Sequence, residues 1–182
     1  MNMPCRHTIR TQWHDYNAGS YFITICTKKQ QHYFGHITCE NSNPKIILST
    51  IGSYAERYLQ SIQHHFPDIQ IPLYSIMPNH IHALVFISGN FSLKEKRNQA
   101  KSPPYNIQMH YANATAQKGR LSTVIGSYKA AITKYAYQNN ITFAWQTRLF
   151  EHIIKHQEEY NAIAEYIQNY VARWYLDKYY KQ

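Results

Sequence analysis

The sequence predicts a mixed α+β fold in which a few helices pack on a mostly antiparallel sheet. Short segments rich in aromatic and β-branched residues alternate with longer segments whose apolar residues recur at helical spacing. Two of the strand-like segments, Ile71–Ile76 and Ile81–Ile87, are joined through the short stretch Met77-Pro78-Asn79. A length of 182 residues with 44% hydrophobic and 16% charged residues suits one globular domain that spans 1–182.

The first third of the chain predicts one long strand, two short ones and a helix. Ser20–Thr27 is the long strand, and short return strands are expected near Phe34–Thr38 and Lys45–Leu48. Ser49 is a candidate N-cap for a helix that runs to about His65. The apolar residues at helical spacing in that segment are Ile51, Tyr54, Ala55, Tyr58, Leu59 and Ile62.

The rest of the chain predicts a long loop, two helices and a further strand. The segment 89–120 has no clear period and is rich in Ser, Pro, Asn and Gln, so we expect a long loop or insertion there. A helix is expected over Ser122–Gln138, a strand over Phe150–Lys155 and a last helix from Glu158 to about Tyr175.

The charge distribution points to a polyanionic partner. The net charge is +9, and no Asp or Glu occurs from Lys96 to Phe150. A phosphate-binding face and an ordinary solvated basic face both fit this window. Within it, Lys129, Arg148 and Arg120 are the candidate phosphate contacts.

Cysteine usage and hydropathy argue against a fold held by disulfides or zinc and against a secreted or membrane protein. Cys5, Cys26 and Cys39 are odd in number and form no CxxC pair, so neither a disulfide framework nor a zinc knuckle is expected. No segment is apolar enough for a signal peptide or a membrane span, and we expect a cytoplasmic protein with no membrane association.

The most informative motif is His80-Ile81-His82, which opens a predicted strand directly after Pro78-Asn79. Because side chains alternate along a strand, both imidazoles lie on one face and can reach a single divalent ion. A bare His-x-His is more often a pair of polar residues at a strand end than a metal site. The position of the pair right after a turn raises the odds of a metal site.

Five segments, taken in order, resemble the HUH endonuclease superfamily. Pro78-Asn79-His80-Ile81-His82 resembles its His-hydrophobic-His signature, and Tyr21-Phe22-Ile23-Thr24 its first strand. Gly126-Ser127-Tyr128-Lys129 resembles its middle helix, and the run from Trp145-Gln146 to His152 its later Trp-Gln segment. Ala164-Glu165-Tyr166-Ile167-Gln168-Asn169 is similar to its catalytic-tyrosine helix. The set is most similar to single-tyrosine transposases of the REP-associated branch, over nearly the whole chain.

The resemblance implies a ferredoxin-like fold, with the C-terminal helix carrying the nucleophilic tyrosine. It implies His80 and His82 as metal ligands, Mg²⁺ or Mn²⁺ as the ion, and Tyr166 as the nucleophile. The implied activity is cleavage and rejoining of single-stranded or hairpin DNA through a 5′-phosphotyrosine. Whether the protein acts as a monomer or a homodimer stays open.

The tyrosine helix departs from the family pattern at two positions. The family continues as Tyr-Ile-x-Asn-Asn-Pro, whereas this chain has Tyr166-Ile167-Gln168-Asn169-Tyr170-Val171. A third metal ligand often lies four residues after the nucleophile, and Tyr170 is a poor one. On a continuous helix Tyr170 would lie at the edge of the buried stripe and Tyr166 further round it. The helical period alone does not exclude Tyr170 as nucleophile.

Two rival functions remain. The altered Asn-Pro segment favours a non-catalytic nucleic-acid-binding protein derived from such a transposase. The His-x-His pair alone also fits a metal-dependent hydrolase of small substrates, which would need no tyrosine.

Overall fold

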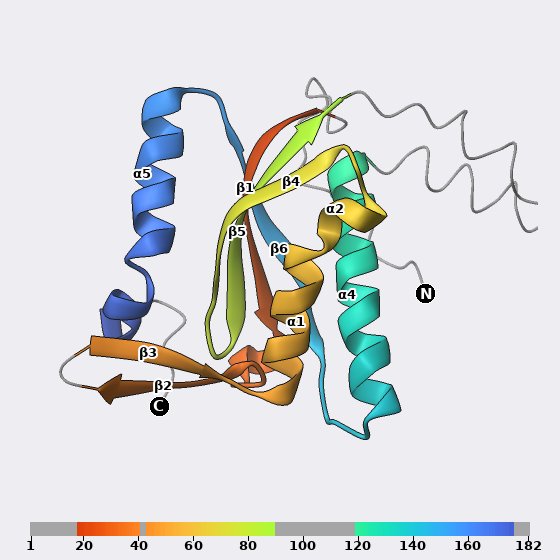
Figure 1. Cartoon of the computed structure of the whole chain (residues 1–182), viewed down its shortest axis with the longest axis vertical. Coiled ribbons are helices and arrows are strands. Elements are labelled where there is room, and N and C mark those ends of the chain that lie inside the picture. Colours follow the sequence, from red (N-terminus) through yellow and green to blue (C-terminus); the bar gives the residue numbers. More distant parts are fainter. Residues whose placement is uncertain (1–17, 41–42, 90–118, 177–182) are drawn as a thin grey trace, which may run out of the picture.

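The computed structural model describes residues 18–40, 43–89 and 119–176, arranged around a four-stranded sheet (Figure 1). The strand order is β4-β5-β1-β6, and each neighbouring pair is antiparallel. The strands are β1 (Ala18–Thr27), β4 (Ile69–Ile76), β5 (His80–Ser88) and β6 (Trp145–Ile154). A separate hairpin of β2 (Gly35–Glu40) and β3 (Asn43–Leu48) lies at one end.

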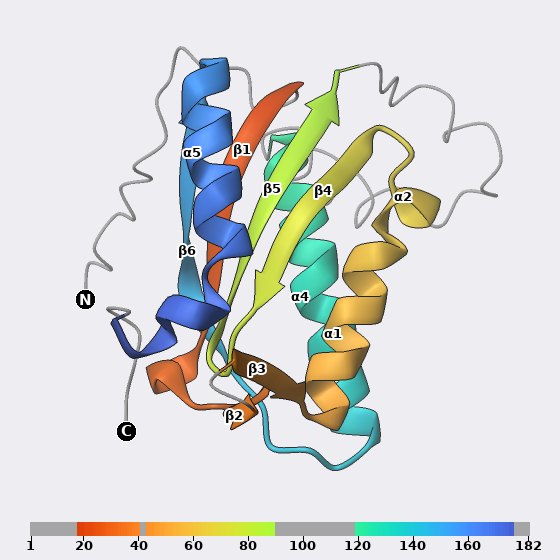
Figure 2. The same cartoon turned by 60° about the vertical axis from the view of Figure 1, so that its left-hand side comes forward.

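The helices divide between the two faces of the sheet. Helices α1 (Thr50–Gln60) and α4 (Arg120–Gln138) cover one face, with α2 (Ile62–His65) continuing from α1. Helix α5 (Gln157–Gln168) runs along the other face (Figure 2). Without the β2–β3 hairpin, the short helical segments η1 (Lys28–Gln30) and α2, and the elements after β6, the order is β1–α1–β4–β5–α4–β6. That order, with this strand arrangement, is the ferredoxin-like topology, which confirms the predicted fold class.

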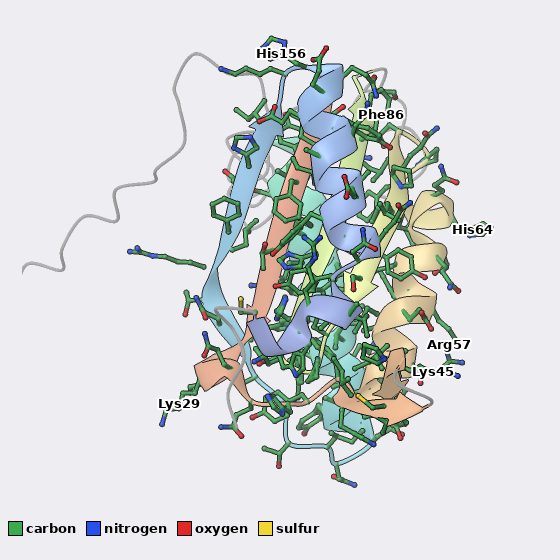
Figure 3. All side chains as sticks on the ribbon, turned by 90° about the vertical axis from the view of Figure 1, so that its left-hand side faces the viewer. Lys29, Lys45, Arg57, His64, Phe86 and His156 are labelled. Carbon is green, nitrogen blue, oxygen red and sulfur yellow. The ribbon has the colours of Figure 1, made fainter. Side chains whose placement is uncertain are left out.

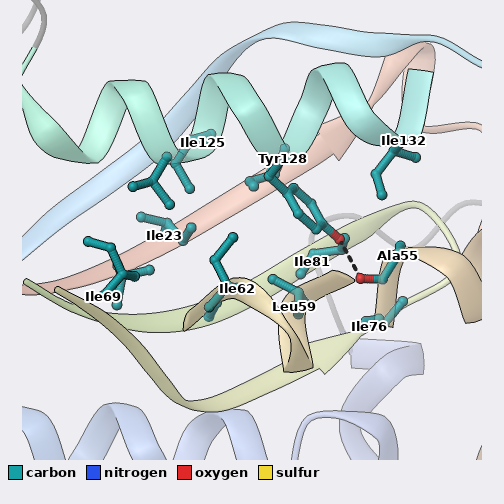
Figure 4. Close-up of a cluster of buried hydrophobic side chains, with 14 of the residues drawn as sticks. Ile23, Ala55, Leu59, Ile62, Ile69, Ile76, Ile81, Ile125, Tyr128 and Ile132 are labelled. Atoms are coloured by element: carbon teal, nitrogen blue, oxygen red, sulfur yellow. Dashed lines mark hydrogen bonds between the residues drawn. The ribbon is translucent and has the colours of Figure 1, made fainter. Parts of the chain in front are cut away.

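The main core lies between the sheet and the pair α1 and α4 (Figure 4). Alternate residues of β1 and β5, such as Ile23 and Ile81, point into it and are at most 1% exposed. Tyr128 of α4 is buried there, and its hydroxyl donates to the Ala55 carbonyl of α1 at 3.2 Å. The residues that alternate with them therefore face α5, and the two histidines are among these.

The predicted N-cap of α1 is confirmed. The Ser49 hydroxyl accepts a hydrogen bond from the Gly52 amide at 3.1 Å and donates to the Tyr33 carbonyl at 2.7 Å. Gly52 is required for close packing, because a Cβ atom there would lie 2.0 Å from the Phe34 carbonyl oxygen. This cap fixes the β2–β3 hairpin against the start of the helix.

Two predicted boundaries are wrong. Strand β6 begins at Trp145, five residues before Phe150, because the tryptophan segment itself pairs with β1. The last helix does not run to Tyr175: α5 ends at Gln168, and a 3₁₀ segment, η3 (Val171–Leu176), follows. The Asn169 side chain donates to the Glu165 carbonyl at 3.1 Å, which competes with continued helix hydrogen bonding.

The loop predicted over 89–120 falls mainly on residues 90–118, which lie outside the described residues. None of the described helices combines the length and the apolar character needed to cross a membrane.

Candidate metal and tyrosine site

His80 and His82 lie on the face of β5 that α5 covers, and both are buried. Their exposed fractions are 0% and 2%. The two Nε2 atoms point at each other and are 3.2 Å apart. The pair is therefore not a set of solvated polar residues at a strand end, which was the alternative that the sequence left open.

The other ring nitrogen of each histidine is held by a neighbour. Asn79 Oδ1 lies 2.7 Å from His80 Nδ1. Because an amide oxygen only accepts, Nδ1 carries the proton, and Nε2 of a neutral His80 keeps its lone pair. Thr24 Oγ1 lies 2.9 Å from His82 Nδ1 across the β1–β5 pairing. A hydroxyl can donate or accept, so His82 can present either a proton or a lone pair at Nε2.

The turn that carries Asn79 is itself fixed. The Asn79 carbonyl accepts from both the amide and the hydroxyl of Thr27, at 2.9 and 3.0 Å. Its side-chain amide donates to the Gln30 carbonyl at 3.3 Å, which assigns Oδ1 to the histidine. The Met77 amide closes the turn onto the His80 carbonyl at 2.8 Å. Backbone hydrogen bonds thus hold His80 in position. Side chains that bind a metal need such rigid support.

The donor set fits a divalent ion. With a nitrogen-to-metal distance of about 2.1 Å, two imidazole nitrogens on one ion lie about 3.0 Å apart at a right angle and about 3.4 Å at a tetrahedral angle. The observed 3.2 Å lies between these values. Hydrogen bonds to the outer ring nitrogens are the usual arrangement around metal-binding histidines.

No third His, Cys, Asp or Glu side chain joins the pair within residues 18–40, 43–89 and 119–176. Oxygens of water or phosphate, which Mg²⁺ and Mn²⁺ prefer, would suit the remaining ligand positions. The predicted metal role of His80 and His82 stays a prediction, and the geometry is compatible with it.

Tyr166 and Tyr170 both lie against the histidines (Figure 3 shows this face). The ring centroid of Tyr166 is 5.5 Å from that of His82, and its side chain is 36% exposed. The Tyr170 ring is 4.4 Å from His82 and 5.4 Å from His80, but it is only 3% exposed. Tyr166 is thus the tyrosine that combines proximity with access from solvent.

The expected place of Tyr170 at the edge of a helical stripe is wrong. Because α5 ends at Gln168, Tyr170 turns inward and packs with Met77 and Trp174 in a small second core. The Trp174 ring lies 6.0 Å from His80, and His32 lies 5.9 Å from Trp174. Burial lowers the pKa of His32 below its ordinary value. This aromatic cap closes the histidine pair from one side.

Lys129 lies in the other helical layer, on α4, and does not join the histidines. Its amine donates to the Gln146 carbonyl at 2.9 Å and lies 5.5 Å from the Trp145 ring centroid. Burial lowers the pKa of Lys129. Its hydrogen bond ties α4 to β6, so the structure gives it a packing role beside the predicted phosphate contact.

Arg120 is also engaged within the fold. Its guanidinium makes a two-point ion pair with Asp68, with Nε to Oδ2 at 2.7 Å, and the side chains are 10% and 6% exposed. It also lies over the Phe66 ring, 5.0 Å from the centroid. Among the three predicted phosphate contacts, Arg148 on β6 is the one whose residue is exposed.

Sequence patterns did not single out Asn79, Thr24 or the cap formed by Tyr170 and Trp174. Asn79 adjoins the motif, so its position was visible, but its role depends on a turn conformation. Thr24 reaches His82 only through the register of β1 against β5. His152 pairs with Glu159 at 2.5 Å and anchors the start of α5 to β6.

Comparison with known proteins relates the chain to a family and a fold. The chain matches no protein-family model. A protein of Haemophilus influenzae described as uncharacterized is 33% identical over 180 residues, which cover 96% of this chain and 93% of the relative. The solved structure of a REP-associated tyrosine transposase bound to a REP hairpin is similar with a TM-score of 0.55 and 12% identity, over 91% of this chain and 74% of that chain.

At 12% identity the structural similarity concerns the fold, and at 33% the sequence similarity establishes kinship. The transposase comparison supports the architecture of this chain, a four-stranded antiparallel sheet with helices on both faces. The chain belongs to one family with the Haemophilus influenzae protein and has a transposase-like α+β fold.

Proposed function

We propose that this protein is a DNA strand transferase of the transposase type, which cleaves and rejoins single-stranded or hairpin DNA through a covalent bond to Tyr166. The observation that carries the proposal is that His80 and His82 point their Nε2 atoms at each other, are held at Nδ1 by neighbouring side chains, and have the solvent-accessible phenol of Tyr166 beside them. The similar fold of a transposase that is bound to a REP hairpin supports DNA as the substrate class.

His80 and His82 would hold Mg²⁺ or Mn²⁺ through their Nε2 atoms. The ion would supply positive charge to the non-bridging oxygens of the scissile phosphate. Asn79 and Thr24 keep the two rings in place while the substrate enters. Phosphate and water oxygens would complete the ligand set, since two imidazoles alone suit these hard ions poorly.

The chemistry is a transesterification in two reversible halves. The Tyr166 phenol attacks phosphorus, forms a new oxygen–phosphorus bond, and gives up its proton. The bond from phosphorus to the 3′ oxygen breaks, and that oxygen takes up a proton. A free 3′-hydroxyl then attacks the phosphotyrosine in the reverse sense and restores the phenol. Bond energy is conserved in the covalent intermediate, so no nucleotide cofactor is needed.

Substrate access requires a rearrangement of the aromatic cap. With both histidines at most 2% exposed, a phosphate cannot reach them while Tyr170 and Trp174 stay in place. Trp174 belongs to the short η3 segment and Tyr170 to the turn between α5 and η3, and neither belongs to the main core. Displacement of that segment would open the pair on the side where Tyr166 lies.

A DNA-binding protein without nuclease activity is the second candidate. The burial of the histidines under Tyr170 favours it, because Tyr170 occupies the place where the family pattern has asparagine. Such a protein would bind hairpin DNA but form no covalent adduct with any divalent ion.

The deciding experiment is incubation with hairpin DNA carrying a single-stranded flank, with Mn²⁺, followed by denaturing electrophoresis. A label at the 3′ end should migrate with the protein, because a 5′-phosphotyrosine retains the downstream fragment. A label at the 5′ end should be released as a shorter strand with a free 3′-hydroxyl. Release of both labels as free DNA would contradict the covalent mechanism.

The matched control uses two tyrosines of the same helix. Tyr166→Phe should abolish the adduct, whereas Tyr160→Phe should keep it, since both remove one hydroxyl and little volume. DNA binding by gel shift in EDTA should be equal in the two variants, which separates loss of chemistry from loss of binding.

A further inference from the structure

Exposed aromatic rings gather on the α5 face of the sheet. Five large hydrophobic side chains of the described residues are exposed, and three of them, Phe86, Phe150 and Tyr166, belong to this face. Figure 3 shows Phe86 beside α5 on the β5 side. Phe150 is 51% exposed and lies on β6, which is an edge strand of the described sheet. The sequence left two roles open for Phe150, stacking on an unpaired base and burial in the core.

Phe150 is connected to the candidate site through a second ring. Phe22 lies 6.2 Å from Phe150 and 6.2 Å from Tyr166, in edge contacts, and it stacks on His82 at 5.2 Å. We call the rings of Phe22, Phe150 and Tyr166 the aromatic ledge. The ledge connects the histidine pair to β6, the edge strand of the described sheet.

The charge beside the ledge suits a phosphate backbone. Arg148 is exposed and precedes Phe150 by two residues, in the part of β6 where the pairing with β1 shifts register. Its position is about 7 Å from that of Phe150 along the strand. Glu159, an acidic side chain of α5 that reaches this face, is paired with His152. The chain as a whole carries a net charge of +9.

We infer that the aromatic ledge binds the unpaired nucleotides next to the scissile phosphate, with Phe150 stacking on one base and Arg148 contacting the adjoining phosphate. The inference rests on the proposed function for its substrate class. Stacking suits single strands because every base offers a flat face, whatever its identity. The ledge therefore selects unpaired DNA, and it leaves recognition of particular bases to other residues.

A duplex cannot use the ledge in this way, because its bases are already stacked on one another. The rings therefore distinguish single-stranded from paired DNA at the point of chemistry. A second copy of the chain against the β6 edge is the competing occupant, and it would bury Phe150 without any nucleic acid.

The test measures binding in EDTA, where no cleavage occurs. The probes are a labelled oligothymidylate and a deoxyribose-phosphate oligomer of equal length that lacks bases. Phe150→Ala should weaken oligothymidylate binding about 5-fold to 150-fold and leave the base-free probe unaffected, as expected for loss of one stacked base. Phe150→Trp should retain affinity, and its fluorescence should be quenched on binding. Tyr137→Ala, which removes a ring that is 85% exposed on α4, is the matched control and should bind like the wild type.

Three results would overturn the inference. One is equal binding of oligothymidylate by Phe150→Ala and the wild type. Another is a wild type that does not distinguish the two probes. The third is a Phe150→Ala variant with altered oligomeric state by light scattering and unaltered DNA affinity, which would make the ledge a protein interface.

The test also separates this inference from the proposed function. Binding that depends on Phe150, with no adduct in Mn²⁺, would support the ledge and refute the strand transferase. An adduct on Tyr166, with binding independent of Phe150, would do the reverse.

Discussion

Replacement of Arg120 by alanine tests whether this residue stabilises the fold or contacts DNA. Its pair with Asp68 joins the first turn of α4 to the start of β4, and the side chains are only 10% and 6% exposed. Breaking a fully buried pair costs about 3–5 kcal/mol, and an exposed pair contributes about 0–1 kcal/mol. The low exposure favours the upper range, so we expect a loss of roughly 2–4 kcal/mol.

The assay is urea and thermal unfolding of Arg120→Ala, Asp68→Ala and the double variant. In a chain of this size, the expected loss lowers Tm by about 5–15 °C. The double variant should lose less than the sum of the single ones, since neither charge is left buried alone. Arg148→Ala, an exposed arginine, should change stability by less than about 0.5 kcal/mol. An Arg120→Ala variant as stable as the wild type, but with weaker DNA binding, would refute the structural assignment.

Three further predictions follow from individual contacts. Mn²⁺ at a hundred times its Kd should stabilise the wild type by about 2.7 kcal/mol and raise its Tm accordingly. His82→Gln should lose this rise in Tm. An equal rise in both proteins would place the ion elsewhere. Arg148→Glu should reduce the slope of log binding constant against log salt concentration by about 0.7 for each lost phosphate contact with single-stranded DNA. Lys129→Glu should mainly lower the stability of the fold. The opposite pattern would reverse the two roles. The pKa of Glu159 is lowered mainly by the hydrogen bond from His152 and secondly by a backbone hydrogen bond, so the ionised carboxylate stabilises the fold above the ordinary glutamate pKa of about 4.3, and this contribution is lost as pH falls through the lowered pKa. The Tm difference between the wild type and Glu159→Gln should therefore vanish in strong acid. A difference that stays constant with pH would exclude this contact as its source.

The fold class could be predicted because the residue pattern of each element is local. The aromatic and β-branched content of 20–27, the alternation along 81–87 and the helical spacing from Ser49 required no knowledge of distant contacts. The end of the last helix could not be predicted in that way. Its apolar spacing continues to Trp174, but the residues after Gln168 bury their apolar side chains from a turn and a 3₁₀ segment. They do so by packing on Met77, which lies in a turn far away in sequence.

The site was predictable in part for the same reason. His80 and His82 share a face because they are two residues apart on a strand, which is a local property. Arg120 was a weaker candidate than its position in an acid-free window suggested. Its partner Asp68 lies 52 residues away in sequence, outside that window, so charge counting along the chain could not find it. Thr24 and the cap over the histidines likewise depend on contacts between distant segments.

The central claim is that Tyr166 forms a covalent bond to DNA beside the histidine pair. The most direct measurement is peptide mapping, by mass spectrometry, of the adduct trapped with hairpin DNA and Mn²⁺. The account predicts a phosphotyrosyl nucleotide on Tyr166, loss of the adduct in Tyr166→Phe, and its persistence in Tyr170→Phe. A nucleotide on Tyr170, or an adduct that survives in Tyr166→Phe, would contradict it and move the nucleophile under the aromatic cap.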